Sequence, residues 1–520
     1  MKDLPQRPHL GHLKKQAKEL LGACHQLDGA ALERVRAALP AAAGCDDAAI
    51  AAMGLRLHDA QSCIAREYGF ASWSQLKAYV DTQAASNADA GELLRQWQLW
   101  AFGGGYQAAR PQLAARLLDE YPSLLAGSPV LACAAGDLVA VGKAIADDAE
   151  WARTRSSTTA MSPLLCACFS GLIRLPEFAQ GIRDGVVLLL AAGADVRDST
   201  IDPTFPGDPL GALYGAAGRN HDAPLTRILL EAGADPNDNE SLYHAAESAD
   251  PACVRLLLEA GARVTGTNAL ARALDFERLQ TVRLMLAHGG DANEHGSVGN
   301  LLTHAIRRRR SAEVVRALLD AGADPSSCDA HGTRAYRLAR RMGLGEVAAL
   351  LRERGARSGS DPREDFIAAC ARADRAAVHD LLAKHPSVLD SLSAEQLRTL
   401  PELAAEGCDD AVRLMVEVGW PIATRGGDIA GSALNQAVFR GDSALAGFLL
   451  AHGAHYDERH GYHDNVYGTL SFASRNGISA DGDWLGCAMV LIDSGAPIPD
   501  PRYEFAEEVE AYFAELRTAA

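Results

Sequence analysis

The sequence predicts an all-α fold in which about twelve stacked helix–turn–helix units form a solenoid behind a separate helical module. An apolar phrase ending in Gly-Ala-Asp recurs along the chain, as in "VVLLLAAGAD" at 186–195 and "VRALLDAGAD" at 315–324. Its glycine returns at intervals near 33 residues, and a period of about 20–50 residues is typical of stacked repeats. The residues before each glycine are apolar at i, i+3 and i+4, the pattern of an amphipathic helix.

A glycine is predicted to end the second helix of each unit, because glycine adopts the left-handed conformation that stops a helix. Successive glycines are separated by 40, 28, 28, 33, 33, 64, 34 and 42 residues. The interval of 64 residues spans two units, since the proline-containing turn "LLAKHPSVLD" replaces one glycine. These helix-ending glycines are Gly193, Gly233, Gly261, Gly289, Gly322, Gly355, Gly419, Gly453 and Gly495.

The two ends of the chain are predicted to cap the solenoid, because a terminal repeat would otherwise expose an apolar face. We expect a helical N-terminal module at 1–92, the solenoid at 93–500 and a capping helix at 501–520. The module's "RLHDAQSCIAREYGFASWSQLKAYV" predicts two helices separated near Gly69, with Ser72 as an N-cap. The C-terminal helix has an amphipathic pattern, and its apolar residues are Phe505, Val509, Tyr512, Phe513 and Leu516.

The repeated unit resembles the ankyrin repeat, whose pattern is TPLHxAxxxGxxxxVxxLLxxGADxN. The segment 240–263, "ESLYHAAESADPACVRLLLEAGAR", shows the resemblance best, and the likeness extends from about 110 to 500. Two segments, 172–185 and 460–468, depart from this pattern and are predicted to be insertions in it. The phrase "AQSCIAREYGFASWSQLK" resembles a helical module found ahead of bacterial ankyrin repeats. The resemblance implies a bacterial ankyrin-repeat solenoid that binds a partner on its concave face.

Composition and charge exclude several classes of function. The net charge of −17 argues against nucleic acid and anionic membranes as partners, because phosphate binding requires clustered Lys and Arg. The longest apolar run, at 186–194, is too short to cross a bilayer. The eleven cysteines form no CxxC pair, and many lie in apolar helical text, which predicts packing roles in a reducing compartment, the cytoplasm.

Catalytic motifs are missing from the sequence, which has no GxSxG, Walker, HExxH or CxxC pattern. The Gly-rich stretch at 101–107 is predicted to be a junction, because no strand precedes it. Four arginines at 307–310 are predicted to form a solvated turn paired with nearby Asp and Glu, with an acidic-peptide contact as the alternative. Cys166 and Cys168 lie two residues apart on a helix and are predicted to pack.

The segment 452–465, "HGAHYDERHGYHDN", holds four of the sixteen histidines. His452 matches His288 in repeat register, whereas the rest forms a finger about six residues longer than its neighbours. The segment 460–495 resembles the C-terminal repeats of bacterial ankyrin proteins with an HGxxDNxxGTLSxAS phrase and no assigned activity. The candidate binding residues are His455, Asp457, His460, Tyr462, His463, Asp464, Asn465, Tyr467, Arg475, Asn476, Asp483 and Trp484.

Three interpretations of this finger remain open. Asp464 and Asn465 cap the next helix or brace the finger, or the aromatic and imidazole side chains form a recognition surface. In the third, His455, His460 and His463 with neighbouring aspartates supply metal ligands or acid–base groups. The resulting hypothesis is a binding protein or scaffold for a protein or small ligand, contacted through 455–468, without catalysis or cofactor. An enzyme with a polar, metal-dependent pocket in the C-terminal repeats is the alternative.

Overall fold

The structure is a computed structural model that describes residues 2, 4, 10–84, 90–104, 108–156, 159–202, 207, 209–356, 359–479 and 482–519. The fold is mostly helical, with 59% helix and 3% strand, as the sequence predicts. The chain forms two compact units. The first unit contains 1–88 and 360–520, and the second contains 89–359. The domain boundaries at 92 and 500 stay predictions.

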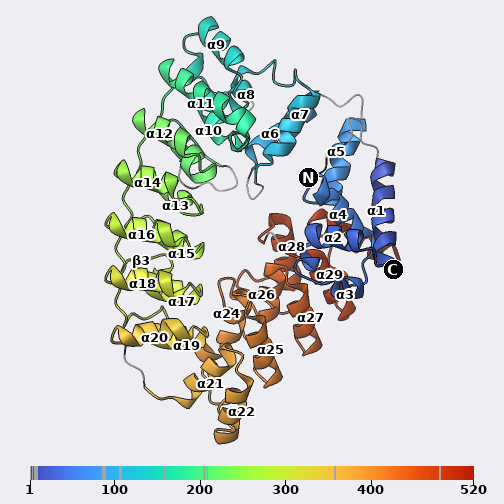
Figure 1. Cartoon of the computed structure of the whole chain (residues 1–520), viewed down its shortest axis with the longest axis vertical. Coiled ribbons are helices and arrows are strands. Elements are labelled where there is room, and N and C mark those ends of the chain that lie inside the picture. Colours follow the sequence, from blue (N-terminus) through green and yellow to red (C-terminus); the bar gives the residue numbers. More distant parts are fainter. Residues whose placement is uncertain are drawn as a thin grey trace. The chain divides into compact units, whose positions relative to one another are not determined.

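Helices of the 89–359 unit are arranged in pairs that stack. Helices α12, α14, α16, α18 and α20 form one row, and α13, α15, α17 and α19 form a second row beside it (Figure 1). The bounds are α6 (Ala90–Phe102), α7 (Pro111–Glu120), α8 (Pro129–Ala134), α9 (Leu138–Asp147), η2 (Trp151–Arg153), α10 (Pro163–Phe169), η3 (Gly171–Arg174), α11 (Pro176–Ala191), η4 (Tyr214–Arg219), α12 (Ala223–Glu231), α13 (Ser241–Ala245), α14 (Ala252–Glu259), α15 (Ala269–Asp275), α16 (Leu279–Ala287), α17 (Leu301–Arg307), α18 (Ala312–Asp320), α19 (Ala335–Arg341) and α20 (Gly345–Glu353).

Short loops connect the helix pairs. Two of them contain antiparallel strand pairs, β1 (Ser199–Thr200) with β2 (Leu210–Gly211), and β3 (His295–Gly296) with β4 (Gly299–Asn300). Every glycine predicted to end a helix has a positive φ, for example 92° at Gly233. The predicted insertion at 172–185 forms η3 and the first part of α11, which has 16 residues.

The first part of the other unit is a bundle of the N-terminal helices. These are α1 (Leu10–His25), α2 (Gly29–Ala38), η1 (Pro40–Ala42), α3 (Asp47–Ala52), α4 (Leu57–Glu67) and α5 (Trp73–Ala84). The break between α4 and α5 lies where the sequence places it, and Ser72 Oγ accepts a hydrogen bond from Gln75 N–H at 3.3 Å. Phe70 and Tyr79 pack in the interior of this bundle, with ring centroids 5.3 Å apart. Helix α5 ends at Ala84, and residues 85–89, before α6, lie outside the described residues.

The second part of this unit again stacks helix pairs. Helices α24, α26 and α28 contact one another in sequence, as do α25, α27 and α29. The bounds are α21 (Pro362–Ala371), α22 (Arg375–Lys384), α23 (Ala394–Leu397), α24 (Thr399–Ala405), α25 (Asp409–Glu417), α26 (Ala433–Arg440), α27 (Ser443–Ala451), α28 (Val466–Asn476), α29 (Trp484–Asp493) and α30 (Glu507–Ala519). Helix α30 buries Val509 and Phe513, two of the apolar residues predicted for the C-terminal helix, whereas Phe505 precedes it.

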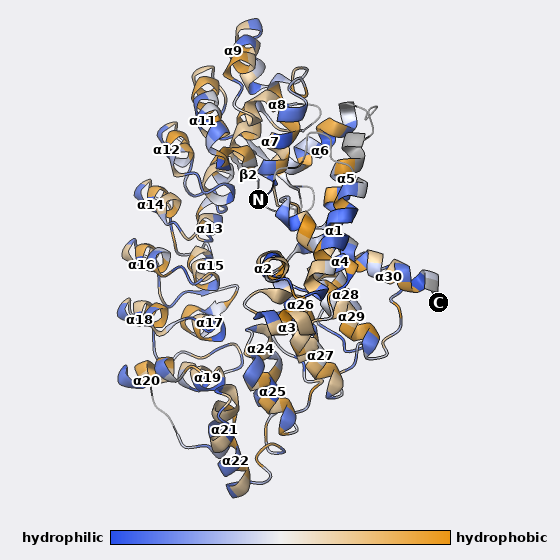
Figure 2. Cartoon of the chain, turned by 45° about the vertical axis from the view of Figure 1, so that its right-hand side comes forward, coloured by the Kyte–Doolittle hydropathy of each residue, from blue (hydrophilic) through white to orange (hydrophobic). Residues whose placement is uncertain are grey.

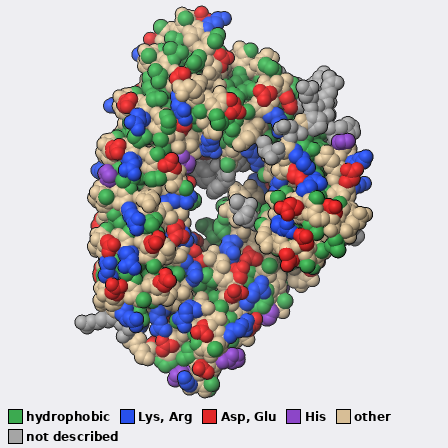
Figure 3. Space-filling model, viewed as in Figure 1, with side chains coloured by type: hydrophobic (Ala, Val, Ile, Leu, Met, Phe, Trp, Pro, Cys, Tyr) green, Lys and Arg blue, Asp and Glu red, His purple; other side chains and the backbone are tan. Residues whose placement is uncertain are grey.

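The apolar residues of the repeats lie between the helices. Figure 2 shows hydrophobic and hydrophilic residues together on α14, α16 and α18, as amphipathic helices require. Figure 3 shows acidic and basic side chains interspersed over the 89–359 unit. Cys166 and Cys168 are fully buried, and burial raises the pKa of the Cys166 thiol to about 12, which confirms their packing role. None of the helices in the described part of the chain combines the length and apolar character that a bilayer crossing requires.

The arginine turn at 307–310 is paired as predicted. Arg307 lies 2.7 Å from Asp329, and Arg308 lies 3.1 Å from Asp275. Arg310 lies 3.6 Å from the carboxylate of Glu277, in the turn between α15 and α16. These pairs confirm the structural interpretation of the turn, because most of its charges already have acidic neighbours.

Candidate functional site

Residues 455–465, here called the C-terminal finger, join α27 to α28 and are anchored by the preceding repeat. Gly461 N–H donates a hydrogen bond to Ile429 O at 2.8 Å. Asn435 Nδ2, on α26, donates to Glu458 O at 3.0 Å. Gly461 suits this approach, because a Cβ there would lie 3.1 Å from Ile429 O. Two backbone positions of the finger are therefore fixed to neighbouring elements.

Asp464 and Asn465 have the capping and bracing contacts that the sequence predicts for them. Asn465 is the N-cap of α28, and its Oδ1 accepts a hydrogen bond from Tyr467 N–H at 3.0 Å. Asp464 Oδ1 accepts from the hydroxyl of Tyr503 at 2.6 Å. Tyr503 lies in the segment that leads into α30, so this bond connects the finger to the C-terminal cap.

Two candidate residues lie inside the protein. Tyr467 is 2% exposed and packs against Tyr456 and Phe513, and burial raises the pKa of its hydroxyl. His460 is 7% exposed, and its Nδ1 accepts a hydrogen bond from Tyr462 N–H at 3.3 Å. Burial lowers the pKa of His460 despite the opposing charge of Asp464, and its Nε2 is buried without a hydrogen-bond partner. A buried imidazole of this kind favours the neutral form.

The end of the finger is exposed and borders a hollow. Tyr462 is 76% exposed, and the next residue, His463, has a φ of 65°, in the left-handed region. Here we call the adjacent concavity of about 560 Å³ the fingertip hollow. It is lined by Arg459, Tyr462, His463, Asp464, Asn465, Arg502 and Tyr503.

The sequence did not single out three of these residues. Arg459 lies within the finger but was not among the candidates. Arg502 and Tyr503 belong to the segment before α30. Arg502 follows Asn465 by 37 residues, and Tyr503 follows Arg459 by 44 residues. The signal at Arg459 was its place in the long finger. No signal in the sequence links Arg502 to that finger.

Four other candidates, which do not line the fingertip hollow, have hydrogen-bond or ion-pair partners of their own. His455 Nδ1 accepts a hydrogen bond from Asp457 N–H at 3.2 Å. Arg475 lies 2.9 Å from a carboxylate oxygen of Glu504, and Asn476 Nδ2 donates to the backbone of its own helix. Within the described residues, no group of three or more His, Cys, Asp and Glu is arranged to hold a metal ion. The metal-site and enzyme alternatives stay predictions.

Asp483 and Trp484 belong to a different part of the surface. Trp484, a candidate binding residue, is the first residue of α29 and is only 7% exposed. Asp483 caps that helix, accepting from Gly486 N–H at 2.9 Å and from Ser443 Oγ at 2.7 Å. Neither residue lines the fingertip hollow.

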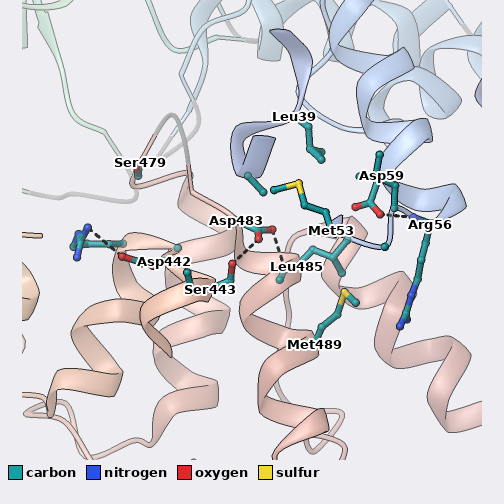
Figure 4. Close-up of a pocket in the computed structure, with 17 residues that line it drawn as sticks. Leu39, Met53, Arg56, Asp59, Asp442, Ser443, Ser479, Asp483, Leu485 and Met489 are labelled. Carbon is teal, nitrogen blue, oxygen red and sulfur yellow. Dashed lines mark hydrogen bonds and ion pairs between the residues drawn. The ribbon is translucent and has the colours of Figure 1, made fainter. Parts of the chain in front are cut away.

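Asp483 instead lines a hollow of about 580 Å³ between the N-terminal helices and α26–α29. Met53 of the N-terminal helices faces Leu485 and Met489 of α29 across it (Figure 4). A second carboxylate from the repeats, Asp442, caps α27 and lies 3.4 Å from a guanidinium nitrogen of Arg440. The carboxylates from the repeats already have partners, so we interpret this hollow as a seam within the unit.

A third hollow, of about 410 Å³, lies on the 89–359 unit between the loops and the inner helices α13 and α15. Tyr243, Arg272 and Asp275 line it, and the Arg272 guanidinium lies 5.2 Å from the centre of the Tyr243 ring. Arg272 also lies 2.8 Å from Glu247. This polar surface belongs to the repeats in which the ankyrin pattern is best preserved.

The environment of His244, beside this hollow, leads us to expect that the stability of the protein depends on pH. Burial opposes its charge, but hydrogen bonds to Glu240 and Glu247 outweigh burial and raise the pKa of His244 to about 9. Its stabilising contribution is therefore complete below pH about 6.5 and is lost as the pH rises through about 9. We expect His244→Gln to lower the free energy of unfolding by about 1–3 kcal/mol at pH 6 and by much less at pH 10.

Urea unfolding followed by circular dichroism at both pH values measures this difference. His288→Gln is the matched control, because His288 is exposed and its Nδ1 lies 3.0 Å from the carbonyl oxygen of Leu284 in the preceding helical turn. An equal loss of stability at pH 6 and pH 10 for His244→Gln would contradict the assignment.

Comparison with known proteins agrees with the repeat pattern in part of the chain. Residues 213–296 match the family model of ankyrin repeats, in three copies. These residues include η4 and α12–α16. No curated protein matches the sequence closely enough to count as a relative.

Proposed function

We propose that this chain is an ankyrin-repeat binding protein and that the C-terminal finger contacts a protein partner. Ankyrin repeats generally mediate protein–protein interaction, and three copies occupy 213–296. We extend the repeat assignment to about twelve units across 93–500, because paired helices and helix-ending glycines recur beyond the matched residues. In this proposal the finger lies on the concave face of the repeats α21–α29 to which it belongs.

The observation that supports this proposal best is the exposure of Tyr462 on an anchored loop. Its side chain is 76% exposed, while Gly461 and Asp464 on either side are bound to other elements. Tyrosine and arginine are the residue types that contribute most at protein interfaces, and a rigid loop loses little entropy on binding. An exposed tyrosine held this way is suited to be a contact residue.

The cysteines support a reducing compartment such as the cytoplasm as the site of action. All eleven are free thiols, and most of them are buried. Burial raises the pKa of the Cys370 thiol to about 12, which makes that thiol unreactive.

Photo-crosslinking tests the proposal. A photoreactive phenylalanine analogue replaces Tyr462 in one variant and Val139 in the control, since Val139 is 83% exposed on α9. Irradiation in the native host is expected to give a discrete cross-linked protein from position 462 and none from position 139. The proposal fails if position 462 gives no discrete product, or the same products as position 139.

A further inference from the structure

Two arginines from separate segments meet at the fingertip hollow. Arg459 comes from the C-terminal finger and Arg502 from the segment between α29 and α30, and His463 belongs to the same lining. Both arginines are exposed. A third cation, Arg425 of the neighbouring loop, lies close enough to add to burial in lowering the pKa of His460. The lining holds two arginines and one carboxylate, Asp464, so it carries a net positive charge in a chain whose net charge is −17.

Most of the hydrogen-bond donors of the two guanidinium groups are unused. Arg459 Nη1 donates to His463 O at 3.3 Å, and Arg502 Nη2 donates to Tyr503 Oη at 3.1 Å. Each guanidinium has five N–H donors. In the described part of the chain, neither guanidinium forms an ion pair with a carboxylate, unlike Arg475, which lies 2.9 Å from Glu504.

The nearby carboxylates are occupied by other donors. Asp464 accepts from the Tyr503 hydroxyl at 2.6 Å and from Asn465 N–H at 2.8 Å. Asp500 accepts from the backbone N–H of Arg502 at 2.9 Å. These bonds hold the two carboxylates in place, so the guanidinium groups can take an external anion.

We propose that the fingertip hollow binds Asp and Glu carboxylates of an acidic segment in the protein partner, an inference that rests on the proposed function. An arginine fork matches a carboxylate with two parallel hydrogen bonds. Tyr462, beside the hollow, would contact the apolar part of the same segment. The net charge of −17 disfavours non-specific binding of an acidic segment to the chain as a whole.

Fluorescence anisotropy with a labelled decamer of alternating glutamate and serine tests the inference on the full chain. We expect the decamer to bind, a glutamine–serine decamer not to bind, and higher salt to weaken the complex. Arg459→Gln and Arg502→Gln should each weaken binding about tenfold or more, since one hydrogen bond to a charged group contributes that much. The matched control Arg375→Gln removes an exposed arginine on α22 that is paired with Glu417, and it should leave binding unchanged.

The inference is overturned if the acidic decamer does not bind, or if the Arg459→Gln/Arg502→Gln double variant binds it as wild type does. It is also overturned if inorganic phosphate or phosphatidylserine vesicles bind the hollow more tightly than the decamer. A cross-link from position 462 that persists in the double variant would leave the proposed function intact and refute carboxylate recognition. Decamer binding without any cross-linked partner would instead refute the proposed function.

Discussion

Replacing Phe513 with alanine is expected to destabilise α28–α30 by about 3–5 kcal/mol, the usual cost of truncating a buried aromatic side chain. Phe513 is 0% exposed. Its ring packs against Phe505, with centroids 4.9 Å apart, and against Tyr467 at 6.0 Å. The cavity would weaken the attachment of α30, and the last helix pair would then expose the apolar face that α30 covers.

Hydrogen exchange followed by mass spectrometry measures this effect, because it gives the opening free energy of each peptide separately. Glu515→Ala, at an exposed position of the same helix, is the control and should change opening free energies by less than about 0.5 kcal/mol. Wild-type protection of α28 and α29 in the Phe513→Ala variant would show that α30 does not stabilise the stack.

Features that depend on short stretches of sequence were predicted correctly. Glycines such as Gly453 and Gly495 end helices in the left-handed conformation, because this property belongs to one residue and its turn. His452 and His288 are equivalent, and in each the Nδ1 lies within 3.0 Å of the carbonyl oxygen four residues earlier. The N-cap at Asn465 also follows from local chemistry.

Features that depend on distant segments could not be predicted. Residues 1–88 belong to the same compact unit as 360–520, and no periodic pattern links the two. Ser62 and Glu508 illustrate this contact, with the hydroxyl donating to the carboxylate at 3.1 Å. Burial raises the pKa of this Glu508 carboxyl.

The fingertip hollow shows the same limit. The histidines of the finger suggested a recognition surface or a metal site. In the structure His460 is buried, whereas Tyr462 is exposed and lines the hollow together with Arg459. Arg502 joins them because Tyr503, the next residue, is hydrogen-bonded to Asp464. The segments that lie beside a loop in a repeat stack are determined by the packing of the repeats, which the sequence of the loop alone does not encode.

Replacing Tyr462 with alanine is expected to weaken partner binding about 30-fold or more, or about 2 kcal/mol, the loss typical of a central aromatic contact. The substitution should leave stability within about 0.5 kcal/mol of wild type, because the side chain is 76% exposed. Val139→Ala, at an equally exposed site on another repeat, should change neither binding nor stability. A destabilised Tyr462→Ala variant would indicate a packing role for this side chain.

The central claim is that the anchored finger presents Tyr462 to a protein partner. Its most direct test is isothermal titration of the partner identified by cross-linking against wild type and Tyr462→Ala. The proposal predicts a Kd about 30-fold or more higher for the variant. Equal Kd values for the two proteins, within a factor of about two, would contradict it.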